Sequence, residues 1–158
     1  GYKLWKKKTD LSNTFYSCVM NNYWHTNYKA DQEGEVTFHY SLFPHNTFDA
    51  AQATRQGLES AQPLIVSAFS SDNPELKSLF TIENKNIILS TIKPSADKKG
   101  VILRLYNASY QSQKPEIKWE SLKPEKVYWS TANQEKLQAF DPDTNWPPFA
   151  FKTLYLKL

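Results

Sequence analysis

Hydrophobic and polar positions alternate in short runs along this chain, which is the pattern of half-buried β-strands. The clearest run lies over residues 35–43, where Val36, Phe38, Tyr40 and Leu42 alternate with polar residues. Successive side chains of a strand point to opposite faces of a sheet, so one face of this strand should be buried. The run therefore predicts a strand at the edge of a hydrophobic core.

Other short runs of aromatic and β-branched residues predict further strands, separated by residues that favour turns. These strands are predicted over residues 15–20, 64–69, 79–83, 86–92, 101–106, 116–120, 126–130 and 149–156. A single short helix is predicted near residues 47–60, because Asn46 followed by Asp49 resembles a helix start. Its apolar stripe is thin and Gly57 weakens it, so we expect the helix to cap or cross a sheet. Short strands at this spacing are typical of a β-sandwich, and the predicted fold class is all-β.

Composition supports a folded, sheet-rich chain. Of the 158 residues, 40% are hydrophobic and 15% are aromatic, which is enough to bury a core and suits a pleated surface. The single cysteine, Cys18, excludes an intrachain disulfide. The core must therefore hold the fold together.

Charge and hydropathy exclude two classes of partner. The net charge of +3 is small and dispersed, which predicts no binding of nucleic acid. No apolar run approaches the roughly 20 residues of a membrane-spanning helix. The chain begins at Gly1 without an initiator methionine, so we expect it to be a fragment of a longer protein.

Residues that could carry out catalysis are scattered. The spacings of His25, His39 and His45 fit no common zinc pattern, and we predict no metal site in this chain. Asp31, Glu33 and Glu35 flank Gly34 in a polar stretch that is better explained as a solvated turn than as a catalytic carboxylate pair. We therefore predict no catalytic residue.

Two further motifs have simple structural interpretations. Residues 141–145 resemble the opening of a calcium loop, but Trp146 replaces the turn glycine and Lys152 replaces the closing glutamate, so an Asx-turn is expected. Asn107-Ala108-Ser109 matches a glycosylation sequon, which has meaning only in a secreted eukaryotic protein.

The most functional-looking stretch covers residues 21–28. It combines flat aromatic rings with short hydrogen-bonding groups, the mixture that sugar recognition uses. The candidate substrate-binding residues are Tyr23, Trp24, His25, Asn27 and Tyr28. The residues alone leave two interpretations open, a sugar site and a buried aromatic corner.

Three ordered blocks of sequence resemble the C-terminal region of glycoside hydrolase family 38, the α-mannosidases, especially its bacterial members. The first block is NNYWHTNY at 21–28, followed by QEG at 32–34 and FHYSLFPH at 38–45. The second is KPSAD at 93–97 with GVILRLYN at 100–107, and the third is PFAFKTL at 148–154. Lys98-Lys99 departs from the family, which often has acidic or glycine residues at this turn.

The resemblance implies a parent enzyme that hydrolyses α-mannosides with retention, using a carboxylate nucleophile and a bound zinc. In that family these groups belong to an N-terminal catalytic domain, so none of them is assigned to this chain. Residues 1–61 would form the end of a galactose-mutarotase-like β-supersandwich that carries the helix, and residues 62–158 would form a terminal β-sandwich. The segment with Trp24 and Asn27 would contribute to the rim of the substrate pocket.

Two hypotheses follow from these patterns. In the first, the chain is a structural and substrate-rim region of an α-mannosidase that is inactive alone; in the second, it is a free-standing carbohydrate-binding or adhesion sandwich. If the supersandwich is cut, its strands expose an apolar face, which favours dimerisation or association with the catalytic domain. The compartment stays open between bacterial cytoplasm and periplasm.

Overall fold

The computed structural model of the chain describes residues 11–20, 27, 29, 31–62, 64–66, 68 and 77–158. Its contacts divide the chain into two compact units, Gly1–Leu42 and Phe43–Leu158. We call them the N-terminal unit and the sandwich unit and describe each by itself. Within the described residues, every helix and strand lies in the sandwich unit.

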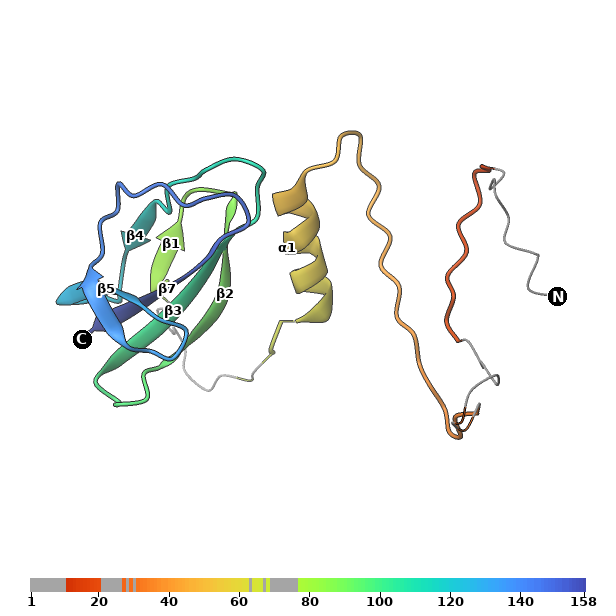
Figure 1. Cartoon of the computed structure of the whole chain (residues 1–158), viewed down its shortest axis with the longest axis horizontal. Helices are drawn as coiled ribbons and strands as arrows, with labels where there is room; N and C mark the ends of the chain where they lie inside the picture. Colours follow the sequence, from red (N-terminus) through yellow and green to blue (C-terminus); the bar gives the residue numbers. More distant parts are fainter. Residues whose placement is uncertain are drawn as a thin grey trace. The chain divides into compact units, whose positions relative to one another are not determined.

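Two antiparallel sheets make up the sandwich unit (Figure 1). The smaller sheet pairs β1 (Phe80–Ile82) with β4 (Ile117–Trp119). The larger sheet has the strand order β2-β3-β7-β5-β6. Its strands are β2 (Ile87–Pro94), β3 (Gly100–Asn107), β5 (Lys126–Ser130), β6 (Lys136–Ala139) and β7 (Phe151–Lys157). The sequence predicted a mostly β fold with one short helix, and the structure confirms it. The β-sandwich is the part of this fold that the structure describes.

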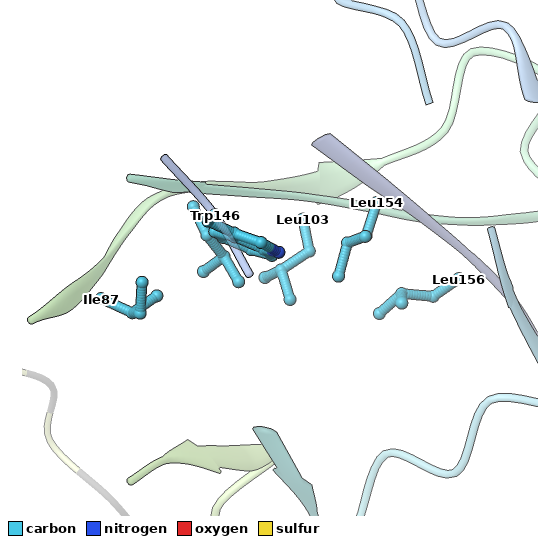
Figure 2. Packing of buried hydrophobic residues seen from close by; sticks show 6 residues of the cluster. Ile87, Leu103, Trp146, Leu154 and Leu156 are labelled. Atoms are coloured by element: carbon cyan, nitrogen blue, oxygen red, sulfur yellow. The ribbon is translucent and has the colours of Figure 1, made fainter. Parts of the chain in front are cut away.

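The core lies between the two sheets. Leu103 and Leu105 of β3 and Leu154 and Leu156 of β7 are fully buried and pack with Trp146 from the loop before β7 (Figure 2). The small sheet closes this cluster with apolar side chains from β1 and β4. The indole N–H of Trp146 is buried without a hydrogen-bond partner among the described residues, which costs about 1–3 kcal/mol that the packing must offset.

The helix α1 (Ala50–Ala61) covers part of the opposite face of the large sheet. Its buried residue Ala51 packs with Ile88 of β2 and Ala108, while the side chain of Arg55 donates a hydrogen bond to a backbone carbonyl before β2. The Asp49 carboxylate caps the helix by accepting the Gln52 N–H at 2.9 Å. Asp49 rather than Asn46 is therefore the N-cap, and the helix begins three residues later than predicted.

The domain boundary predicted between residues 61 and 62 stays a prediction. The contacts of α1 group the helix with the sandwich unit, whose first residue is Phe43.

Three predicted strands are wrong for the described chain. Residues 15–20 and 35–43, and the described residues of 64–69, belong to no strand of the described part of the chain. The alternating side chains of 35–43 are all exposed, from 45% for Phe38 to 92% for Leu42. A strand needs a neighbour to accept its hydrogen bonds, and the described residues supply none. The alternating pattern thus indicates that a segment can form a strand, but it does not indicate which strand it would pair with.

Backbone conformation explains two strands that start late. Phe149 has a φ of 55° and Glu116 a φ of 47°, in the left-handed region that interrupts a strand. The strand predicted from 149 therefore starts at Phe151, and the strand predicted from 116 starts at Ile117. Strand β6 was not predicted, because it is only four residues long and all four are exposed at the sheet edge.

We predict that Gly100→Ala destabilises the sandwich by about 2 kcal/mol, because the new methyl group would overpack a closed contact. A Cβ at Gly100 would collide with the Leu156 carbonyl oxygen and lie 2.9 Å from two ring atoms of Tyr155. Urea unfolding followed by circular dichroism would measure the loss. Gly57→Ala is the matched control, because its Cβ meets nothing within 4 Å in α1 and should raise helix stability. Equal unfolding midpoints for both variants would contradict the prediction.

Candidate functional site

The predicted substrate-binding segment falls largely outside the described residues. Tyr23, Trp24, His25 and Tyr28 lie there, whereas Asn27 is described as an exposed residue in a bend. The structure therefore neither brings these five side chains together nor separates them. Their role at a substrate rim stays a prediction.

Carboxylates in the N-terminal unit form a solvated turn, as predicted. Lys29 lies 2.8 Å from a carboxylate oxygen of Glu33 and 3.4 Å from one of Asp31. All three side chains are exposed, and Gly34 supplies the turn with a φ of 102°. Exposed ion pairs of this kind contribute little stability. The ion pairs with Lys29 account for Asp31 and Glu33, and no catalytic role is needed to explain these two residues.

A polar cluster around Asp97 is the strongest electrostatic feature of the sandwich unit. Its carboxylate accepts hydrogen bonds from the Ser95 hydroxyl at 2.5 Å, the Lys99 backbone N–H at 3.1 Å and the Tyr155 hydroxyl at 3.0 Å. The ammonium of Lys136 lies 3.7 Å from the carboxylate and 3.9 Å from the centre of the Tyr155 ring. The Ser95 hydrogen bond, helped by those of Lys99 and Tyr155, lowers the pKa of Asp97 to about 2.

Turn chemistry places this cluster at one end of the large sheet. The β2–β3 turn carries Asp97, and the Ala96 N–H donates to the side chain of Gln134 in the β5–β6 turn at 2.8 Å. Lys98 has a φ of 57° in this turn. Glycine adopts this left-handed conformation most easily, so a lysine holds it here at some cost in conformational energy.

The Asp97 cluster is a structural anchor rather than an acid or base. A carboxylate with a pKa of about 2 stays ionised at neutral pH, and its oxygens are already occupied by donors. A general acid or base needs a pKa near the working pH. The cluster therefore ties two turns to the β7 strand.

A hollow of about 760 Å³ surrounds Arg104 in the middle of β3. The guanidinium donates to the Thr153 hydroxyl and to the Ala132 carbonyl, each at 3.3 Å. Through these two hydrogen bonds, Arg104 of β3 links its strand to β7 and to the turn after β5. Sequence reasoning missed it, although a basic residue inside an apolar run was the available signal.

Two sequence motifs have structural roles. Asn107 is fully buried and its amide donates to the carbonyls of Gln111, Trp146 and Pro147, so the sequon asparagine is part of the fold. Asp141 accepts the backbone N–H of Asp143 at 2.9 Å, which confirms the predicted Asx-turn.

The described part of the chain contains neither a metal-binding cluster nor a membrane-spanning helix. Within it, no group of three or more His, Cys, Asp or Glu side chains is arranged to hold a metal ion. No described helix is both long and apolar enough to cross a membrane. The zinc expected in the catalytic domain of a parent enzyme stays a prediction.

Most of the sandwich unit matches the model of a known family. The family model described as "Glycosyl hydrolases family 38 C-terminal beta sandwich domain" matches residues 86–156, from the start of β2 almost to the end of β7. Residues 86–156 are similar to this family 38 C-terminal β-sandwich domain. This supports the resemblance noted in the sequence for residues 93–97, 100–107 and 148–154. No curated protein and no solved structure matched the chain.

The matched residues include the second and third blocks of the resemblance, whereas the first block lies outside them. The Asp97 cluster, the Arg104 tie and the Asn107 hydrogen bonds all fall inside the match. The match suggests a mannosidase-like role for this part of the chain.

We predict that acid unfolds this domain through Asp97. The pKa of Asp97 is lowered from 3.8 to about 2 in the folded state, so its contribution to stability is complete well above pH 3.8 and is lost as the pH falls toward 2. Asp97→Asn should remove much of this pH dependence, measured as the urea midpoint at a series of pH values.

Tyr155→Phe removes one hydrogen bond to the carboxylate and should move the acid transition to higher pH. Tyr128→Phe is the matched control, because Tyr128 pairs with Tyr155 on the neighbouring strand but does not contact Asp97. If the urea midpoint of Asp97→Asn fell at low pH as it does in the unsubstituted chain, Asp97 would not be the source of the acid sensitivity.

Proposed function

We propose that this chain is the C-terminal β region of an α-mannosidase-like glycoside hydrolase and that it has a structural and substrate-rim role. The observation that carries the proposal is the match of residues 86–156 to the family 38 C-terminal β-sandwich domain. In this proposal the parent enzyme hydrolyses α-mannosides, and its carboxylate nucleophile and zinc belong to an associated N-terminal catalytic domain. No residue of this chain is given either role.

Exposed apolar residues in the N-terminal unit support an association with further protein. Phe15 and Leu42 are 98% and 92% exposed, and Tyr16 is 90% exposed. The Ser17 hydroxyl lies 2.8 Å from the Tyr40 hydroxyl, which joins two segments that have the sequence pattern of strands. Apolar surface on strand-forming segments favours pairing with another chain or domain. The proposed occupant is the remainder of the β-supersandwich next to the catalytic domain.

The rim role depends on residues 21–28. Aromatic rings stack on the C–H faces of sugars, and a side-chain amide such as that of Asn27 can bond to two neighbouring hydroxyls. A segment of this composition that borders a catalytic pocket would position the mannoside without taking part in bond cleavage. Such positioning acts on turnover, because a displaced substrate loses its alignment with the nucleophile.

We predict that the isolated chain has no α-mannosidase activity and self-associates. Activity would be measured with an aryl α-mannoside, and mass with size-exclusion chromatography and light scattering. Substituting Phe15→Ser and Leu42→Ser together should reduce the association, because both side chains are exposed apolar residues of the N-terminal unit.

Leu137→Ser is the matched control for this experiment, since Leu137 is 48% exposed on the edge strand β6 of the sandwich. It should leave the association unchanged. A clean, stable monomer of the unsubstituted chain, or mannoside hydrolysis by it, would contradict the proposal.

We also predict that Trp24→Ala or Asn27→Ala lowers turnover by the full-length parent enzyme by about tenfold, which corresponds to the loss of about 1.4 kcal/mol of substrate stabilisation. Steady-state kinetics would measure kcat and KM for each variant. Asn13→Ala, an exposed asparagine outside the segment, is the control. If both variants folded correctly and kept the kcat and KM of the wild-type enzyme, the proposed role of this segment at the substrate rim would be wrong.

A further inference from the structure

A groove of about 500 Å³ lies on the sandwich unit between the start of α1 and the loop after β3. Aromatic and amide side chains line it, and those that the argument uses are Phe48, Gln52, Asn86, Tyr110, Gln111 and Gln113. Its volume is within the range of roughly 300–1,000 Å³ that is usual for small-molecule sites. All of these residues belong to one unit.

Aromatic rings stand exposed in this groove. Tyr110 is 70% exposed and Phe48 is 59% exposed. The Phe149 ring meets the Tyr110 ring edge to face, with ring centres 4.9 Å apart. A solvent-facing ring offers a flat surface on which the apolar face of a ligand can stack.

Amide groups beside the rings are available to a ligand. Within the described residues, the side-chain amides of Gln52, Asn86 and Gln111 make no hydrogen bond, and Gln113 is fixed by Asn84 at 3.0 Å. Each free amide offers both donors and an acceptor. Paired donor and acceptor groups match vicinal hydroxyls better than they match a charged group.

The groove carries almost no charge. Its single charged lining residue is Asp49, and that carboxylate already accepts the Gln52 N–H at 2.9 Å as the helix cap. No lysine or arginine is among the described residues that line the groove, so an anionic ligand would find no counter-charge there. A neutral ligand with hydroxyl groups and apolar faces fits this lining.

The loop that carries Tyr110 and Gln111 is held rigidly. The buried Asn107 amide donates to the Gln111 carbonyl at 2.8 Å, and its side-chain oxygen accepts the Ser109 N–H at 3.1 Å. Binding groups held in place before the ligand arrives avoid an entropy cost on binding. The loop thus presents a preformed surface.

We propose that this groove binds a neutral saccharide of one or two sugar rings, which stacks on Tyr110 and is held by the amides of Gln52, Asn86 and Gln111. The proposal goes beyond the proposed function, because it concerns a binding surface of the sandwich unit that works whether or not an enzyme is attached. Its failure would leave the role in a glycoside hydrolase untouched.

The test uses the whole chain and two probes, mannobiose and cellobiose, followed by two-dimensional NMR at millimolar sugar. Saturable shifts of amide signals from the loop after β3 are expected with at least one probe. Tyr110→Ala should weaken that binding about tenfold, whereas Tyr110→Phe keeps the ring and should retain most of it.

Gln111→Ala should weaken binding as well. Ser112→Ala is its control, because Ser112 is an exposed neighbour in the same loop that does not line the groove. Folding of each variant is read from the dispersion of the same spectra. Absence of saturable shifts with both sugars would overturn the proposal. Equal binding by Tyr110→Ala and the unsubstituted chain would also overturn it.

Discussion

The pairing of β3 with β7 is the interaction on which the rest of the sandwich depends. Seven consecutive residue pairs join the two strands in the middle of the large sheet, from Gly100 opposite Lys157 to Tyr106 opposite Phe151. One face of this strand pair supplies the leucines of the core. The other face supplies Tyr155, whose hydroxyl donates a hydrogen bond to the Asp97 carboxylate. At Gly100 the two strands approach so closely that a Cβ would collide with the Leu156 carbonyl oxygen and press on the Tyr155 ring. Since these strands are about 50 residues apart in the chain, their contact fixes the topology.

The larger part of the sandwich could be predicted from the sequence, because its strands are marked by apolar runs between turn residues. Six of its strands were expected near their observed positions, and β5 was predicted with its observed bounds. The missed strand, β6, consists of exposed residues whose position depends on hydrogen bonds to β5. Its alternation of polar and apolar residues is too short to predict a strand by itself, and the pairing with β5 decides the conformation.

The remaining errors have the same physical origin. Residues 35–43 have the best alternation in the chain, yet they have no strand partner among the described residues. Alternation reports which face could be buried, and the neighbour that buries it must come from elsewhere. The Asp97 cluster and the groove at Tyr110 were also beyond prediction, since each joins residues from different loops. Of the substrate-binding residues that the sequence suggested, the structure describes Asn27 alone.

The hydrogen bonds of Asn107 have a consequence for the chemical lifetime of the protein. Asparagine ages by deamidation, in which the next backbone nitrogen attacks the side-chain carbonyl and closes a five-membered imide. Here that nitrogen, on Ala108, donates to the Asn86 carbonyl at 2.9 Å, and the Asn107 amide is held by three carbonyls. Ring closure would require breaking all of these bonds inside a buried site. The residue that resembles a glycan attachment point is therefore among the asparagines best protected from spontaneous ageing.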